Sequence, residues 1–287
     1  MQVVDVSDPA SPTLRGTYVM TSDAFDVQVV SDLAFVADDA DGLQIIDVSD
    51  TSNPVLRGSS IALGDAVDVQ VADNLAYVAD QKYGLQIVDV DVPTSPRLLA
   101  SYPTPTAARA VQVVGGRAYI VTGTGYPPYA SQLLLFDVRD TNHLSLQGSY
   151  TALADAYRMD VVGDLAYVTD GNAGLQIIDV SNPASPTLRG LYYTSSAIDI
   201  QVVDDLAYLA YPISYVDPDT RLEIVDVSDP ANPIWRGRYQ TPGATVALQI
   251  TGDRVYVADR NGGLQILGFH PERLPPKMFL PLVQRAK

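Results

Sequence analysis

Hydrophobic residues gather in short runs of five or six residues, and turn-forming residues separate these runs along almost the whole chain. Between residues 67 and 102 there are four such runs, with Asp, Asn, Gly and Pro between them. The runs are rich in Val, Ile, Leu and Tyr, which predicts short β-strands. We name these strands a, b, c and d and expect them at Val67–Val71, Leu75–Ala79, Leu85–Val90 and Arg97–Tyr102.

Strand b is apolar on both of its alternating faces. Leu75 and Tyr77 lie on one face, and Ala76 and Val78 lie on the other. Strand c has the same property. A sheet with two apolar faces must be covered on both sides, whereas a sandwich sheet shows polar residues on its solvent face. The pattern therefore favours sheets that are stacked face to face.

The pattern recurs along the chain with a nearly constant spacing. The segment Gln-Ile-Ile-Asp-Val that starts at residue 44 has counterparts that start at residues 2, 86, 134, 176, 223 and 265. Successive starts are 42, 42, 48, 42, 47 and 42 residues apart. A period of about 42 residues with four strands is typical of propeller blades, and a β-helix coil would be shorter.

The number of a strands predicts the number of blades. We expect an all-β, six-bladed β-propeller of four-stranded antiparallel blades over residues 1–270, followed by a C-terminal tail at residues 271–287. The C-terminal repeat supplies three strands of the last blade, and the N-terminal strand near Thr13–Val19 is expected to supply the fourth, which removes exposed sheet edges. The strand Gln2–Val6 is then surplus, which leaves an incomplete seven-bladed propeller as the alternative. The six a strands begin near Ala24, Ala66, Ala108, Ala156, Ala197 and Thr245.

Three copies of the repeated segment resemble a known family. Leu43–Asp47, Leu85–Asp89 and Leu222–Asp226 are similar to the LVIVD repeat of bacterial and archaeal surface proteins, and the strand order resembles that of YVTN-type surface propellers. The resemblance covers about residues 1–269. It implies a propeller that is secreted or displayed at the cell surface. It implies no catalytic residues, because the family has none in common.

The composition excludes several classes of function. The chain has 34 acidic and 18 basic residues, which gives a formal net charge of −16, and 32 of the acidic residues are Asp. Such a surface repels phosphate backbones, which argues against nucleic-acid binding. The absence of Cys excludes disulfides, thiolate zinc sites and Cys nucleophiles. No apolar run approaches the roughly 20 residues of a membrane-spanning helix.

Two b-to-c connections are six residues longer than the others. They lie in the third and fifth repeats, and both carry two Tyr residues beside Pro. In a propeller all b-to-c loops lie on one face, so we expect the two loops to flank the fourth blade on that face. Tyr offers a large contact area at low entropic cost, which suits a binding surface, although surface loops also tolerate insertions without function. The expected contact residues are Tyr126, Tyr129, Tyr211 and Tyr215.

The a strands carry polar residues at one aligned position. A ring of amides near the axis is able to bind a small polar ligand, but hydrogen bonds from each blade to the next are the favoured interpretation. Arg109 and Arg158 break the symmetry near the start of their strands, where they are able to hold an anion or carboxylate or to pair with neighbouring Asp residues. The aligned residues are Gln28, Gln70, Gln112, Asp160, Gln201 and Gln249.

Metal and catalytic motifs are sparse. Asp39 and Asp41, and likewise Asp217 and Asp219, offer oxygen ligands of the kind that Ca²⁺ uses, but Asp before Gly is also ordinary turn chemistry. No cofactor is expected, with calcium as the one candidate. The chain has two His and two Glu residues, and it contains no Gly-x-Ser-x-Gly motif and no phosphate-binding loop.

The sequence therefore predicts a non-catalytic, extracellular or cell-surface binding or scaffold module. Its expected partner is a protein or a glycan at the face that carries the long loops, with Arg109, Arg158 and Asp160 as further ligand-binding candidates. The alternative is a propeller enzyme, a lyase or hydrolase, with its site at the axial channel near these three residues.

Overall fold

The computed structural model describes residues 1–60, 64–127, 129–141, 143–194, 197–212, 220–260 and 262–268. The fold is an all-β propeller of six blades, as the repeat predicts. In the described part of the chain the only helical element is the 3-10 helix η1 (Gly171–Ala173). The tail predicted at residues 271–287 lies outside the described residues. The chain divides into two compact units, residues 1–152 and residues 153–287, each of which is described by itself.

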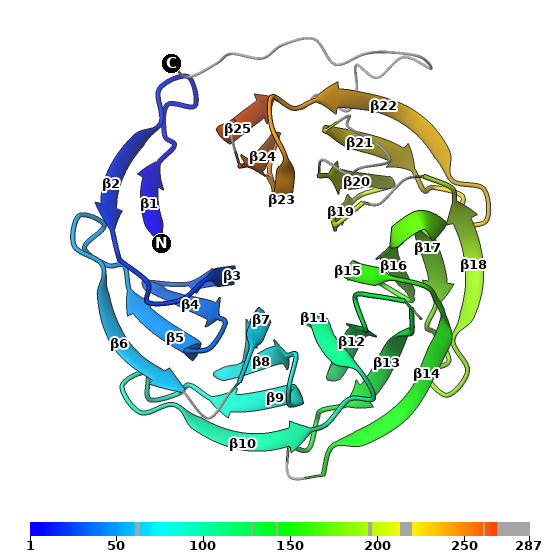
Figure 1. Ribbon diagram of the computed structural model, residues 1–287, viewed down its shortest axis with the longest axis horizontal. Coiled ribbons are helices and arrows are strands. Elements are labelled where there is room, and N and C mark those ends of the chain that lie inside the picture. Colours follow the sequence, from blue (N-terminus) through cyan, green and yellow to red (C-terminus); the bar gives the residue numbers. More distant parts are fainter. Residues whose placement is uncertain are drawn as a thin grey trace. The chain divides into compact units, whose positions relative to one another are not determined.

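The first unit contains the N-terminal hairpin and three four-stranded sheets, in which the strands follow one another in chain order. The first strands of the three blades lie side by side, and the fourth strands lie on the opposite side of the blades (Figure 1). The hairpin is β1 (Gln2–Asp5) and β2 (Thr13–Thr17), and the blades are β3 (Ala24–Val30), β4 (Leu33–Asp38), β5 (Gly42–Asp47) and β6 (Val55–Ser60); β7 (Ala66–Ala72), β8 (Leu75–Asp80), β9 (Gly84–Asp89) and β10 (Arg97–Tyr102); and β11 (Ala107–Val114), β12 (Arg117–Gly123), β13 (Ser131–Asp137) and β14 (Ser145–Leu153).

The second unit contains two four-stranded sheets and a three-stranded sheet with the same chain order. The four strands predicted between residues 67 and 102 agree with the observed bounds to within one residue at each end. Every sheet is a meander whose turns contain Asp, Asn, Gly or Pro. The blades are β15 (Ala156–Val162), β16 (Leu165–Asp170), β17 (Gly174–Asp179) and β18 (Thr187–Tyr192); β19 (Asp199–Val203), β20 (Leu206–Tyr211), β21 (Arg221–Asp226) and β22 (Ile234–Gln240); and β23 (Thr245–Thr251), β24 (Arg254–Asp259) and β25 (Gly263–Gly268).

The N-terminal hairpin differs from the strand pairing expected for the chain ends. The strand expected to complete the last blade, β2, is hydrogen-bonded to β1, and β23, β24 and β25 form a sheet of three strands. The reason is local sequence, because β1 repeats the sequence of a c strand and c pairs with d in every complete blade. The register shift between Val3 and Val4 matches the shift between Ile45 and Ile46 in the first blade.

The hydrophobic cores lie between neighbouring blades, as the two apolar faces of strands b and c require. Between the first and second blades, Phe35 and Ile45 pack with Val69 and Val78. Within the second unit, Tyr167 and its neighbours pack against the following blade in the same way. Burial of apolar surface on both sides of each sheet supplies the main stabilising free energy of such a stack.

The turn from c to d is fixed by a repeated carboxylate. Asp47 accepts hydrogen bonds from the backbone N–H and the hydroxyl of Ser49, at 2.8 and 2.6 Å. It also accepts one at 2.8 Å from Nε of Arg57, ten residues later on the d strand. These bonds lower the pKa of Asp47 to about 2, the Ser49 bonds contributing most. The carboxylates that recur in the Asp-Val-Ser segments are therefore structural.

Candidate functional site

The long loop of the third blade presents two tyrosines on the surface. The loop follows β12 and precedes β13, and the side chains of Tyr126 and Tyr129 are 69% and 48% exposed. The hydroxyl of Thr124 donates to the carbonyl oxygen of Tyr126 at 2.9 Å and accepts from the N–H of Ala130 at 3.4 Å. Thr124 therefore ties the two ends of the loop together while both aromatic rings stay accessible.

Arg109 on β11 packs against the base of this loop. A Cβ atom added to Gly123 would lie 3.1 Å from Cζ of Arg109, and one added to Gly125 would lie 2.7 Å from its Nη2. Gly125 also has φ +73°, a conformation that side chains rarely adopt. The two glycines thus allow the guanidinium group to approach the loop backbone, which places a positive charge beside the two tyrosines of an acidic protein.

The tyrosine expected at the start of the other long loop is not on the surface. Tyr211 is 1% exposed, which corrects the expectation that it contributes to an exposed aromatic surface. It is the last residue of β20, and its hydroxyl lies 2.8 Å from Oγ1 of Thr194, so its ring fills space between blades. The guanidinium of Arg221 lies 4.0 Å from the centre of that ring. Tyr215 lies outside the described residues.

Sequence reasoning missed a buried polar cluster around Tyr211. Arg221 and Glu223 are 8% and 7% exposed, and Nε of Arg221 lies 3.6 Å from Oε2 of Glu223. The hydroxyl of Tyr192 donates to Glu223 at 3.2 Å. Burial, followed by the charge of Glu223, raises the pKa of both tyrosines. The available signal was Glu223 itself, because five other copies of the repeated segment carry Gln at that position.

The residue that ends strand b explains why only two loops are long. The other four blades place a buried Asp there, and Asp80 accepts from the backbone N–H groups of Gly64, Lys82 and Tyr83. These bonds hold a short turn in place. At the aligned position the third and fifth blades have Thr122 and Tyr211, so the carboxylate that fixes the short turn is missing where the long loops occur.

The aligned polar residues of the first strands join neighbouring blades, which confirms the interpretation favoured from the sequence. Oε1 of Gln70 accepts from the N–H of Val113 at 2.5 Å, and Oε1 of Gln201 accepts from the N–H of Ile250 at 2.6 Å. A second rung lies two residues earlier, where Oδ2 of an Asp accepts from the next blade. Such bonds join Asp26 to Val69, Asp68 to Val111 and Asp199 to Leu248, at 3.1, 2.7 and 2.8 Å.

Asp160 and Arg158 lie two residues apart on β15, where the pairing with β16 shifts register between Ala156 and Met159. Oδ2 of Asp160 accepts from the N–H of Val202 on β19 at 2.6 Å, so it replaces Gln in the same bridging role. The backbone N–H of Arg158 donates to Oγ1 of Thr169 at 3.1 Å. Arg109 belongs to the first unit, and the structure places it under the loop of the third blade.

The calcium candidates do not form a metal centre in the described structure. A carboxylate oxygen of Asp41 accepts hydrogen bonds from the hydroxyls of Thr21 and Ser22. Within the described ranges no three His, Asp or Glu side chains gather closely enough to hold a metal ion. Asp217 and Asp219 are outside those ranges. No helix of the described residues is long and apolar enough to cross a membrane.

The repeats match a known family over most of the chain. The pattern of the LVIVD repeat matches residues 1–20, 22–60, 63–104, 154–194, 196–241 and 242–267. The chain belongs to the LVIVD repeat family. The matched ranges leave out residues 105–153, which include Arg109 and the exposed tyrosine loop. In this LVIVD repeat protein the exposed tyrosines of the third blade, Tyr126 and Tyr129, therefore lie outside the ranges that match the family pattern.

Solved structures share the fold at low sequence identity. A functionally unknown protein from Desulfotomaculum acetoxidans DSM 771 is 13% identical and has a TM-score of 0.71. The match covers 91% of this chain and 87% of the chain of that protein. A putative 6-phosphogluconolactonase from Bacteroides fragilis NCTC 9343 is 10% identical, with coverage of 92% and 85% and a TM-score of 0.71. Sqt1 of Saccharomyces cerevisiae is 10% identical, with coverage of 93% and 76% and a TM-score of 0.67. No curated protein matches the sequence.

Proposed function

We propose that this LVIVD repeat protein is a non-catalytic binding or scaffold module, located outside the cell or at its surface, that engages a protein or glycan partner. The contact surface is the loop of the third blade, residues 124–130. One observation carries the proposal: Tyr126 and Tyr129 are exposed on a loop that Thr124 ties and Arg109 supports.

A tied loop with exposed tyrosines has the properties of a contact surface. Tyr has few rotatable bonds, so it loses little conformational entropy when it is buried against a partner. The hydrogen bonds of Thr124 restrict the loop before binding, which reduces the ordering cost further. The guanidinium of Arg109 lies against the loop backbone at Gly123 and Gly125 and so supports the loop from below.

The inner strands support a non-catalytic role. Asp160, the carboxylate proposed for the enzyme alternative, accepts a backbone hydrogen bond from the next blade. The same bridging role belongs to Gln70 and Gln201, which are amides and carry no acid or base function. The location outside the cell is part of the proposal and is supported by the resemblance of the repeats to surface proteins.

The proposal is tested by removing both rings. The purified protein and the variant Tyr126→Ala/Tyr129→Ala are applied to glycan and protein arrays, and hits are measured by surface plasmon resonance. Central aromatic contacts contribute about 2 kcal/mol or more, so we expect the double variant to bind at least about 30-fold more weakly. A hit on the glycan array or on the protein array shows which of the two classes of partner binds.

Tyr193→Ala is the matched control, because Tyr193 is 79% exposed but follows β18 in the fourth blade and is not part of the third-blade loop. We expect this variant to bind with unchanged affinity. Equal binding by the double variant and the wild type would refute the loop as the contact surface. Loss of binding in the Tyr193→Ala variant alone would move the surface to the second unit.

A further inference from the structure

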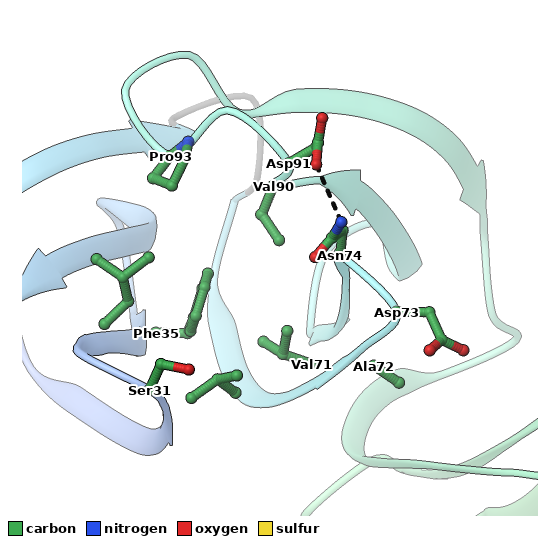
Figure 2. Close-up of a pocket in the computed structure, with 11 residues that line it drawn as sticks. Ser31, Phe35, Val71, Ala72, Asp73, Asn74, Val90, Asp91 and Pro93 are labelled. Atoms are coloured by element: carbon green, nitrogen blue, oxygen red, sulfur yellow. Dashed lines mark hydrogen bonds between the residues drawn. The ribbon is translucent and has the colours of Figure 1, made fainter.

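A pocket of about 340 Å³ lies between the first and second blades of the first unit. Its walls come from the turn between β3 and β4, the turn between β7 and β8, and the turn that follows β9 (Figure 2). These turns lie at the strand ends opposite to the b-to-c loops, so the pocket is separate from the loop that carries Tyr126 and Tyr129.

The pocket occurs beside the only b strand that has Phe in place of Tyr. Phe35 lines it, whereas the aligned residues in the other five blades are Tyr. In the second unit, burial and the charge of Asp205 in the following blade raise the pKa of the aligned Tyr167. At that interface the Tyr side chain packs against the next blade. The first blade lacks this hydroxyl, and the pocket lies between Phe35 and the turn of the second blade that carries Asp73 and Asn74.

The pocket has an apolar floor. The side chains of Phe35, Val71 and Val90 face the hollow in Figure 2, and Pro93 forms part of its wall. Phe35 is 3% exposed, so its ring is fixed by packing and presents a constant surface. A floor of this kind favours an aromatic or branched aliphatic group of a ligand over a polar one.

The rim of the pocket is acidic. Asp73 and Asp91 are the two charged residues among those that line it, and both are negative. One oxygen of Asp91 accepts from Nδ2 of Asn74 at 3.0 Å, which orients the carboxylate (Figure 2). The excess of 34 acidic over 18 basic residues adds to the negative potential around the pocket. A cationic group is therefore the charge complement of this rim.

We propose that this pocket binds a small organic cation, with an aromatic or branched aliphatic group on the Phe35 floor and an ammonium group at the rim formed by Asp73 and Asp91. The apolar floor supplies affinity through burial of hydrophobic surface, and the carboxylates supply selectivity for positive charge. This site is independent of the proposed contact surface on the third blade.

The experiment compares two probes that share a ring but differ in charge. The ¹⁵N-labelled full-length protein is titrated with 2-phenylethylammonium and, separately, with 3-phenylpropionate, and amide chemical shifts are followed. We expect the cation to shift the amides of Val71, Asn74 and Asp91 and to bind at least about tenfold more tightly than the anion. Equal affinity for both probes, or no saturation up to about 10 mM of the cation, would overturn the proposal.

Phe35→Tyr is the decisive variant, because five blades of the same chain fold with Tyr at this position. The restored hydroxyl fills the space beneath the turn, and we expect the cation to bind at least about tenfold more weakly. Tyr119→Phe, the converse change in the third blade, is the matched control and leaves binding at this pocket unchanged. Asp91→Asn is expected to reduce the preference for the cation about threefold or more. Unchanged binding by Phe35→Tyr would contradict the assignment.

Discussion

The side-chain bridge from Gln70 to the third blade is the part of the structure most open to a direct test. Oε1 of Gln70 accepts from the N–H of Val113 at 2.5 Å, and its Nε2 donates to the carbonyl of the same residue at 3.2 Å. No backbone ladder links β7 to β11, so this amide and Asp68 connect the two strands. Gln70→Ala removes both bonds of the amide and leaves the neighbouring blades otherwise unchanged.

The expected magnitude follows from the two lost hydrogen bonds. A neutral hydrogen bond contributes a net of about 0.5–1.5 kcal/mol, and a partly buried group such as Val113 regains some of this from water. We expect the free energy of unfolding to fall by about 1–2 kcal/mol. For a unit of this size that corresponds to a decrease in Tm of about 2–8 °C. Gln81→Ala is the control, because Gln81 is exposed in a turn of the same unit.

Hydrogen exchange reports on the bond itself. In the Gln70→Ala variant the amide of Val113 should exchange about tenfold faster, whereas the amide of Val111, which Asp68 holds at 2.7 Å, should stay protected. Denaturant unfolding of the same samples gives the loss of stability. If Val113 kept its protection and the stability loss equalled that of Gln81→Ala, the side-chain ladder would not be what joins the first strands.

Two further predictions concern stability. Gly58→Ala should lower the free energy of unfolding by about 1–3 kcal/mol, because the added Cβ would overlap the carbonyl oxygen of Pro93 in the next blade. Denaturant unfolding measures the loss, and Gly268→Ala is the control because its added Cβ would meet no neighbouring atom. Equal losses of stability in the two variants would contradict the contact with Pro93. Stability should also fall as the pH drops from about 4 to about 2, because the pKa of Asp47 and of Asp137 is lowered to about 2 from 3.8, so that the stabilisation present above 3.8 is lost as these groups protonate. Asp38 and Asp170 oppose this trend, since burial raises the pKa of each and their protonated forms favour folding at low pH. Thermal unfolding across this pH range shows whether stability falls as the pH is lowered. The Asp47→Asn variant should lose less stability than the wild type between about pH 4 and about pH 2.

Much of the fold follows from features that repeat. A 42-residue period and strands with two apolar faces predict stacked meanders, because a face left in water would be unfavourable in every blade. The aligned Gln residues predicted bonds between blades for the same reason, since a buried amide needs partners. The N-terminal hairpin was less predictable. Both β1 and β25 have the sequence of a c strand, and the sequence pattern does not decide which of them pairs with β2.

The candidate site was predictable only in part. Tyr126 and Tyr129 lie in a turn with Pro and Gly, which predicts exposure correctly. Tyr211 has similar neighbours in the sequence but is the last residue of β20, at the position where four other blades bury an Asp, and its ring is buried. The substitution of Phe35 for Tyr is visible in the sequence, whereas the pocket beside it depends on how the adjacent turns pack.

Hydrogen exchange of the bound complex shows whether a partner binds at the loop of the third blade. With the partner found on the arrays, we expect slower exchange of amides in residues 123–131 and no change on β15. Slower exchange around Arg158 and Asp160 on β15, with residues 123–131 unaffected, would contradict the account and favour a site at the inner strands.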